Sequence, residues 1–335
     1  MMSTRNIASF GIVFLIVGWC TYTIFLNNKN EKEASRDTQH SSTAAPQIRR
    51  TSEEARVVDI NHKQVKNTDT SHRQIIGHLC SLSMPLSVLC IGDSITYGNG
   101  SHVRKKERDH EGNYPVALEK YLRAACGVRQ RSNDIVVTNL GSSGKTLLDG
   151  FKQSYKNTTL YKTAVKLAAT AHVVIVMLGT NDSKPRHWRS KEAFASALVD
   201  FVEHLSTINE KLKFVLMTPP PSFPDPRVVR RLQKHTMLGN IRPVIIRNDI
   251  RVAVMSAAER TGADVIDIFG EFDTMDDLHS LAGHLEENKS GRQLDEVEAG
   301  HVATTIQQYF HDGVHPTLES HEFIASIVAH ELTGV

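Results

Sequence analysis

Short, near-continuous apolar runs follow one another after Pro85, and amphipathic stretches separate them. Apolar runs of this kind are typical of parallel strands that are buried on both faces. Their alternation with helical stretches predicts one α/β domain with a mainly parallel sheet. The five predicted strands are residues 86–91, 135–140, 173–178, 214–217 and 265–268.

Two of the intervening stretches have a clear helical pattern. Residues 190–209 repeat apolar side chains on one face, and Ser190 stands at the position of an N-cap. A last helix is expected after Pro316. The side chains that it would bury are Phe323, Ile324, Ile327, Val328 and Leu332.

A different pattern opens the chain, because residues 7–26 contain no charged side chain. A helix of that length matches the hydrocarbon core of a bilayer, which is about 30 Å thick. The run therefore predicts a membrane anchor. A cleaved signal peptide and a buried helix are the alternatives, although the bulky residues at the end of the run make a poor cleavage site.

The basic residues on the two sides of this segment are nearly balanced, with a slight excess after it. We nevertheless expect residues 1–6 to form a short cytoplasmic tail and the rest of the chain to be lumenal. Three N-x-S/T sequons, at Asn99, Asn157 and Asn288, suit a glycosylated compartment. These features predict a single-pass type II membrane glycoprotein of the secretory pathway, or a secreted protein if the segment is cleaved.

Residues 27–84 contain no Phe, Trp or Tyr and are rich in polar and charged residues. Such a segment cannot bury enough apolar area to offset the entropy lost on ordering it. We predict a flexible stem between the anchor and a globular domain at residues 85–335. A helical stalk around residues 53–66 is the alternative.

Composition narrows the class of protein. The chain of 335 residues is 40% hydrophobic and 23% charged, which is ordinary for a globular protein. A formal charge of +2 argues against a dedicated nucleic-acid binder. Four cysteines without C-x-x-C spacing argue against a disulfide scaffold and a structural zinc site. The pair His279 and His284 makes no convincing metal site, so no metal or cofactor is predicted.

Glycines and polar residues come directly after the predicted strands, where parallel sheets place their chemistry. These segments read GDSIT at 92–96, NLGSSGKT at 139–146 and GTNDS at 179–183, and DGVHP at 312–316 precedes the last helix. Together they supply a hydroxyl, glycine amides, a carboxamide and an Asp/His pair. Those are the parts of an acyl-transfer site: a nucleophile, oxyanion donors, a base and the residue that orients it.

These four blocks resemble, in order, the motifs of the SGNH hydrolases, also called the GDSL family. The matches are GDS at 92–94, a glycine after the second strand, GTND at 179–182 and DxxH at 312–315. The resemblance covers about residues 86–332. It implies a three-layer α/β/α sandwich with a mainly parallel five-stranded sheet. This arrangement is flavodoxin-like.

The resemblance also assigns roles to matching residues. Ser94 would be the nucleophile, His315 the base that takes its proton, and Asp312 the residue that orients the imidazole. A turn or cap role for Ser94 and a surface position for His315, one of 17 histidines, are the alternatives.

Three donors would form the oxyanion hole: the backbone amides of Ser94 and Gly144 and the side-chain amide of Asn181. Gly141 is the alternative to Gly144, and glycosylation is the alternative role of Asn181. A phosphate-binding loop at 141–146 is disfavoured because its pattern requires glycine where this chain has Asn139. The residues expected to support the site are Asp93, Gly179 and Asp182.

Two segments are longer than the catalytic frame requires, namely 101–113 and 270–311. Long loops at strand ends commonly shape substrate pockets. The basic residues within 104–108 would either meet an anionic substrate or form a solvated loop.

The sequence of the third block, MLGTNDSKP followed by Trp188, resembles that of the sialate and carbohydrate O-acetylesterases, one branch of the family. With a lumenal stem, it favours an esterase that hydrolyses O-acetyl groups on carbohydrate. The alternatives are a lipid or lysophospholipid esterase, a membrane-anchored glycan O-acetyltransferase and a glycan-binding protein without activity. The usual pattern of the transferases lacks GTND, so its presence here favours hydrolysis.

Overall fold

The sheet of this protein has five strands in the order β2-β1-β3-β4-β5, and every neighbouring pair is parallel. The strands are β1 (Leu86–Gly92), β2 (Ile135–Gly141), β3 (Val173–Met177), β4 (Lys213–Met217) and β5 (Asp264–Ile266). The structure, a computed structural model, describes residues 77–82, 85–101, 112–127, 134–223, 240–279 and 296–335.

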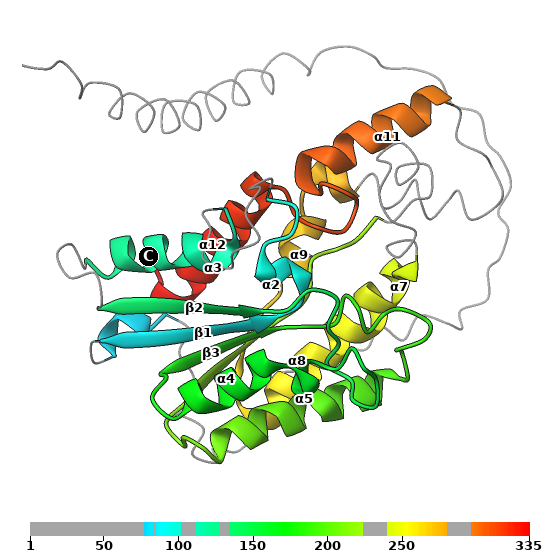
Figure 1. The fold of residues 1–335 in the computed structure, drawn as a ribbon. Helices are drawn as coiled ribbons and strands as arrows, with labels where there is room; N and C mark the ends of the chain where they lie inside the picture. The colour runs from blue at the N-terminus through cyan, green and yellow to red at the C-terminus, as the bar shows by residue number, and fades with distance from the viewer. Residues whose placement is uncertain (1–76, 83–84, 102–111, 128–133, 224–239, 280–295) are drawn as a thin grey trace, which may run out of the picture. The chain divides into compact units, whose positions relative to one another are not determined.

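Helices cover both faces of this sheet and give three layers (Figure 1). One face carries α3 (Tyr114–Ala125), α11 (Glu296–Tyr309) and α12 (Leu318–Thr333). The other carries α4 (Thr159–Ala168), α5 (Lys191–Ser206) and α8 (Arg251–Thr261). The shorter helical segments are η1 (Leu79–Ser81), α2 (Ser94–Tyr97), η2 (Tyr155–Asn157), α7 (Pro243–Ile245), η4 (Ile246–Ile250) and α9 (Ile268–Asp273).

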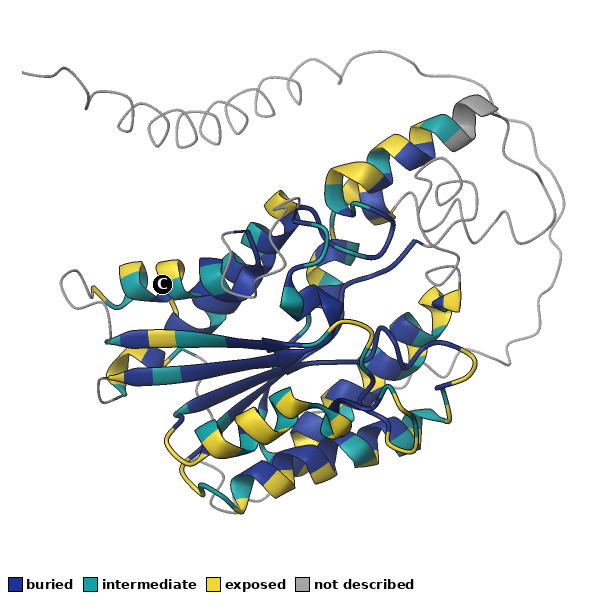
Figure 2. Ribbon diagram, viewed as in Figure 1, coloured by how far each residue is buried: buried dark blue, intermediate teal, exposed yellow. Residues whose placement is uncertain are grey.

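The two cores form because side chains alternate between the faces of each strand. On β1, Val88 and Cys90 belong to the core beneath α3 and α12, whereas Leu89 and Ile91 belong to the core beneath α4, α5 and α8. Figure 2 shows the sheet as the buried centre of the domain. The predicted parallel five-stranded sheet is therefore confirmed, and only strand ends differ, since Ile268 starts α9 instead of ending β5.

The two predicted helices are also present. Ser190 caps α5 by accepting a hydrogen bond from the Ala193 amide at 3.1 Å, and the helix ends at Ser206, earlier than expected. The Thr317 hydroxyl caps α12 through the Ser320 amide. Within the segment 270–311, which is longer than the catalytic frame requires, the described residues Phe272, Ile306 and Phe310 belong to the core.

The folded domain starts earlier than the predicted boundary at residue 85. Leu79 is fully buried, and the Gly77 amide donates a hydrogen bond to the Glu331 carbonyl at the end of α12 at 2.7 Å. The assignment of residues 77–82 to a flexible stem was therefore wrong, because these residues pack on the domain. The predicted tail, anchor and remaining stem, the basic block within 104–108 and the sequon at Asn288 lie outside the described residues. None of the helices within the described ranges has the length and hydrophobicity of a membrane span.

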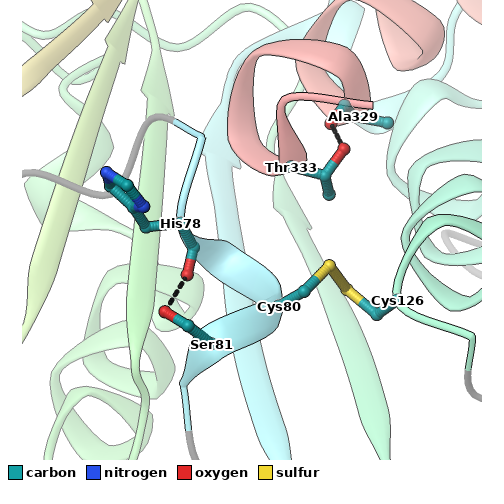
Figure 3. Close-up of a disulfide and its surroundings, with 6 residues drawn as sticks. All are labelled: His78, Cys80, Ser81, Cys126, Ala329 and Thr333. Atoms are coloured by element: carbon teal, nitrogen blue, oxygen red, sulfur yellow. Dashed lines mark hydrogen bonds between the residues drawn. A yellow bond between two sulfur atoms is a disulfide. The ribbon is translucent and has the colours of Figure 1, made fainter.

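A disulfide joins Cys80 in η1 to Cys126 at the end of α3 (Figure 3). η1 leads into the start of β1 and Cys126 precedes β2, so the bond lies at the amino ends of the strands. Spacing did not predict this pair, since 46 residues separate the two cysteines. Cys90 on β1 is buried and free.

Removal of this disulfide by the pair of substitutions Cys80→Ser and Cys126→Ser is expected to lower the free energy of unfolding by about 2–4 kcal/mol, because the unfolded chain regains the freedom of the closed loop. Denaturant unfolding measures this loss. The ester hydrolysis that the sequence motifs lead us to expect should stay within about twofold, since the bond lies at the edge of the sheet opposite the carboxyl ends of the strands. A reductant should destabilise the wild type but not the double variant, and an equal effect on both would contradict the assignment.

Candidate active site

Ser94 stands at the carboxyl end of β1, on a sharp turn from the strand into α2. A Cβ on Gly92 would overlap the Thr96 side chain and lie 2.7 Å from the Met177 carbonyl oxygen, so the turn requires glycine. The Asp93 carboxylate caps α2 by accepting a hydrogen bond from the Ile95 amide at 2.9 Å. Ser94 is thus the first residue of a short helix, where backbone N–H groups have no partner within the helix.

His315 is held by a tight loop between α11 and α12. The loop is closed by the pairing of Phe310 with Pro316 and by a 2.8 Å hydrogen bond from the His311 amide to the His315 carbonyl. Within it, Asp312 Oδ1 accepts the amides of Val314 at 3.1 Å and His315 at 2.8 Å. The same carboxylate therefore builds the turn and reaches the imidazole, which explains the three-residue spacing of the Asp/His pair.

The three predicted catalytic residues lie in one chain of hydrogen bonds. Asp312 Oδ2 is 2.7 Å from His315 Nδ1, and His315 Nε2 is 2.9 Å from Ser94 Oγ. Because a carboxylate only accepts, Nδ1 carries the proton of the neutral ring, and Nε2 is left to accept the Ser94 hydroxyl. This is the arrangement that a serine nucleophile and its base require.

Asp312 is suited to remain ionised beside the imidazole. Burial by itself would raise the pKa of this carboxyl. The hydrogen bonds and charge of His315 and the Val314 amide outweigh burial and hold the pKa below its ordinary value. Asp312 can therefore keep the His315 ring in one orientation over the working pH range.

Asn181 follows β3 in the turn that Gly179 begins, next to Ser94 because Met177 of β3 pairs with Gly92 of β1. Its side chain is buried, with Nδ2 donating to Asp93 Oδ2 at 3.4 Å and Oδ1 accepting from Lys184 Nζ at 2.8 Å. A carboxamide that is buried and bonded at both ends is not accessible for glycosylation of the folded domain.

The glycine loop after β2 lies against the same edge. The Ser142 amide donates to the Gly92 carbonyl at 2.9 Å, and Gly144 adopts a φ of 76° that favours glycine. The Gly141 amide donates to Asn139 Oδ1 at 2.9 Å, so this N–H is already used inside the strand end. Of the two candidate glycines, Gly144 is thus the better placed to offer an amide to a ligand.

Asp182 ties the second block to the third. Its two carboxylate oxygens accept the amides of Leu147 at 3.0 Å and Leu148 at 2.8 Å, which fixes the loop that carries Gly144. Burial raises the pKa of Asp182 to about 7. The two amide hydrogen bonds lower this pKa, and the nearby charge of Asp93 raises it further. Burial also raises the pKa of Asp93. Both carboxyls thus hold neighbouring groups of the site in place, and their supporting role stays a prediction.

Lys184 is a site residue that the sequence analysis did not single out. Its side chain is buried and contacts the Asn181 amide, and His187 Nδ1 lies 2.9 Å from the Asn181 carbonyl oxygen. Lysine is usually exposed and histidine is intermediate in burial, so residue type did not distinguish these two from the other basic residues of the loop.

With this geometry established, comparison with known proteins is informative. Residues 88–328 match the profile of the GDSL-like Lipase/Acylhydrolase family. The chain belongs to this family. Membership confirms the predicted family and the predicted enzyme class, the carboxylic ester hydrolases.

One curated protein matches part of this GDSL hydrolase. An acetylxylan esterase from Xylanibacter ruminicola is 28% identical over 188 residues, which cover 55% of this chain and 36% of that protein. The chain thus spans about a third of the length of that curated relative.

The solved structures that match this chain include two esterases. Est24, a carbohydrate acetylesterase from Sinorhizobium meliloti, is 18% identical, with a TM-score of 0.49 over 74% of this chain and 99% of that one. A putative arylesterase from Agrobacterium tumefaciens str. C58 is 19% identical, with a TM-score of 0.49 over 75% and 99%.

The raised pKa of Asp182 predicts a pH dependence of stability for this GDSL hydrolase. Between the ordinary value of 3.8 and about 7, the folded state holds a proton that the unfolded state has lost. Through this group, the free energy of unfolding therefore falls as pH rises from about 4 to about 7, by up to about 4 kcal/mol. Asp182→Asn should flatten this slope in denaturant unfolding at pH 4.5, 6 and 7.5.

The control is Asp200→Asn, which replaces an exposed carboxylate on α5. This variant should keep the wild-type slope. An unchanged slope in Asp182→Asn would mean that the carboxylate is ionised throughout this range and that its two amide bonds compensate for burial.

Proposed function

We propose that this protein is a serine esterase that removes O-acetyl groups from carbohydrate through an acyl-enzyme. The observation that carries the proposal is the continuous chain from Ser94 Oγ to His315 Nε2 at 2.9 Å and from His315 Nδ1 to Asp312 Oδ2 at 2.7 Å. It stands at the carboxyl edge of a parallel sheet, where such folds bind ligands.

In the first half of the reaction, Ser94 Oγ attacks the ester carbonyl carbon while His315 Nε2 takes the hydroxyl proton. The imidazolium that forms is stabilised by the Asp312 carboxylate. It then gives its proton to the leaving alcohol, and the acyl group remains on Ser94. In the second half, water attacks the acyl-enzyme with the same base, which releases acetate and restores the Ser94 hydroxyl.

Negative charge forms on the carbonyl oxygen during both halves. The amides of Ser94 and Gly144 and Asn181 Nδ2 are the proposed donors to this oxyanion. The hydrogen bonds that Asp182 makes to the Gly144 loop, and those that Asp93 and Lys184 make to Asn181, support preorganised donors.

Two observations support an acetylated carbohydrate as the substrate. The matched relative is named as an acetylxylan esterase, and the match extends over 55% of this chain. The sequence around Asn181 and Trp188 also resembles the sialate and carbohydrate O-acetylesterase branch. A small acyl group on a sugar hydroxyl is the substrate class that both favour.

The disulfide supports a site of action in the secretory pathway or outside the cell. Disulfides such as Cys80–Cys126 persist in oxidising compartments and are rare in the cytosol. We therefore retain the proposal of a type II membrane glycoprotein with a lumenal catalytic domain, anchored by residues 7–26. Protection of the domain from protease in intact microsomes tests the orientation.

Ser94→Ala in the full-length protein is expected to abolish acetate release, because no other group forms the acyl-enzyme. The melting temperature should change by less than about 3 °C, since one hydroxyl is lost without a cavity. Rates are measured with nitrophenyl acetate and with O-acetylated xylo-oligosaccharides and sialosides. Wild-type-like turnover in this variant would contradict the nucleophile.

The same assay separates the alternative activities. Nitrophenyl esters of long acids should be poorer substrates than the acetate, and the reverse order would indicate a lipid esterase. Transfer of acetyl to an added glycan in excess of its release to water would indicate a transferase. Glycan binding without turnover of any ester would indicate a protein that binds but does not hydrolyse.

Asn181→Ala is expected to lower kcat by about 10²–10³ and to change KM little. The reason is that the carbonyl oxygen carries full negative charge only near the transition state, so the lost donor affects kcat. Asn181→Asp should be slower still, because a carboxylate repels the oxyanion. Full turnover in Asn181→Ala would contradict the oxyanion role.

A further inference from the structure

Lys184 is a buried lysine whose ammonium reaches the proposed oxyanion residue. Only 8% of its surface is exposed, and Nζ donates to Asn181 Oδ1 at 2.8 Å. The backbone turns tightly here, since the Lys184 amide donates to the Asn181 carbonyl at 3.4 Å. The amides of His187 and Trp188 both donate to the Lys184 carbonyl at 2.9 Å. A lysine three residues after Asn181 is thereby folded back onto that residue's side chain.

This contact matters because a carboxamide has two unlike ends. Asn181 can serve an oxyanion only if Nδ2, and not Oδ1, faces the reacting carbonyl. An ammonium group donates and never accepts, so its only stable partner on Asn181 is the oxygen. The position of Lys184 therefore determines which way the amide is turned.

Asp93 holds the other end of the amide but cannot fix its direction alone. Its Oδ2 accepts from Asn181 Nδ2 over a long 3.4 Å. A contact of this length lies beyond the usual range of N–H···O hydrogen bonds and holds the amide only weakly. A turned amide would place Oδ1 toward the oxyanion and leave the Lys184 ammonium facing an N–H donor.

We propose that Lys184 is a positioning residue of the oxyanion hole, which fixes the Asn181 carboxamide with its N–H groups toward the reacting oxygen. The inference rests on the proposed function. It extends that function to a residue that directly follows the GTNDS segment and had no role assigned. Lys184 acts through Asn181, and no contact of its own with the substrate is part of the role.

Burial and the neighbouring charges both act on the Lys184 ammonium. Burial lowers the pKa of the ammonium, as does the neighbouring charge of exposed Arg186, while Asp93 and Asp182 oppose the shift. An apolar side chain of similar length would avoid the cost of burying a charge. An apolar side chain could not, however, donate a hydrogen bond to Asn181 Oδ1.

Lys184→Met keeps the length of the side chain and removes the donor. We expect kcat for nitrophenyl acetate to fall about 10- to 100-fold with KM within about twofold, because the disordered amide weakens only transition-state binding. The matched control is Lys166→Met, at an exposed position on α4, which should retain wild-type kinetics. An unchanged kcat in folded Lys184→Met would overturn the proposal.

A double-mutant cycle shows whether Lys184 acts through Asn181. In the Asn181→Ala background there is no amide to orient, so Lys184→Met should change kcat by less than about threefold. Losses that simply multiply would mean that the ammonium acts on the oxyanion directly, and that result would overturn the positioning role. Thermal unfolding of every variant checks that the comparison is between folded proteins.

Two further variants keep the test decisive if Lys184→Met fails to fold. Arg at this position still only donates, whereas Gln can donate or accept. Lys184→Arg should therefore retain more kcat than Lys184→Gln, and the opposite order would overturn the proposal. An inactive wild type, or a Ser94→Ala variant that keeps activity, would instead overturn the proposed function, so the two failures are distinguishable.

Discussion

The parallel pairing of β1 with both of its neighbours is the constraint on which the active site depends. Gly92 lies opposite Gly141 of β2 and Met177 of β3 in the same register. Parallel strands end at one edge, so the three segments that follow them emerge side by side. The nucleophile turn, the glycine loop and the Asn181 turn are brought together by this register before any of their side chains interact. The strand order also changes direction between β1 and β3, the point at which open α/β sheets bind ligands.

Burying polar groups at that edge is unfavourable, and hydrogen bonds to neighbouring groups compensate for the lost hydration. Asp182 receives two backbone amides, and Asp312 receives two amides and an imidazole. Lys184 and Asp93 share the Asn181 amide. Because an unpaired buried charge costs several kcal/mol, each partner is required by the other. The opposite edge is stabilised differently, by apolar packing of Leu79 and by the disulfide.

The sequence allowed the sheet, the α5 cap and the four blocks to be predicted, because these depend on local patterns: apolar runs, a serine before a helix, glycines after strands. The Cys80–Cys126 bond and the core position of Leu79 depend on contacts between residues far apart in the chain. The same holds for Lys184. A lysine is expected to be exposed to solvent, and only the tight turn after Asn181 shows that this side chain is directed inward. The core position of Ile306 could not be predicted either, because α11 has few strongly apolar residues and therefore a weak helical pattern.

The site consists of two halves, which the Ser94–His315 hydrogen bond and contacts through Asn99 join. The oxyanion half is fixed by bonds among the segments that follow β1, β2 and β3. The base half is fixed separately: the Phe223 amide after β4 donates to the Gly313 carbonyl at 2.6 Å, and His321 of α12 lies 3.2 Å from the Asn99 carbonyl oxygen. The Asn99 amide in turn donates to the Ser94 carbonyl at 2.9 Å, which links α12 back to the nucleophile helix. Ser94 Oγ and His315 Nε2 can therefore meet at 2.9 Å although 221 residues separate them, because a short path of hydrogen bonds through Asn99 sets the distance between the two halves.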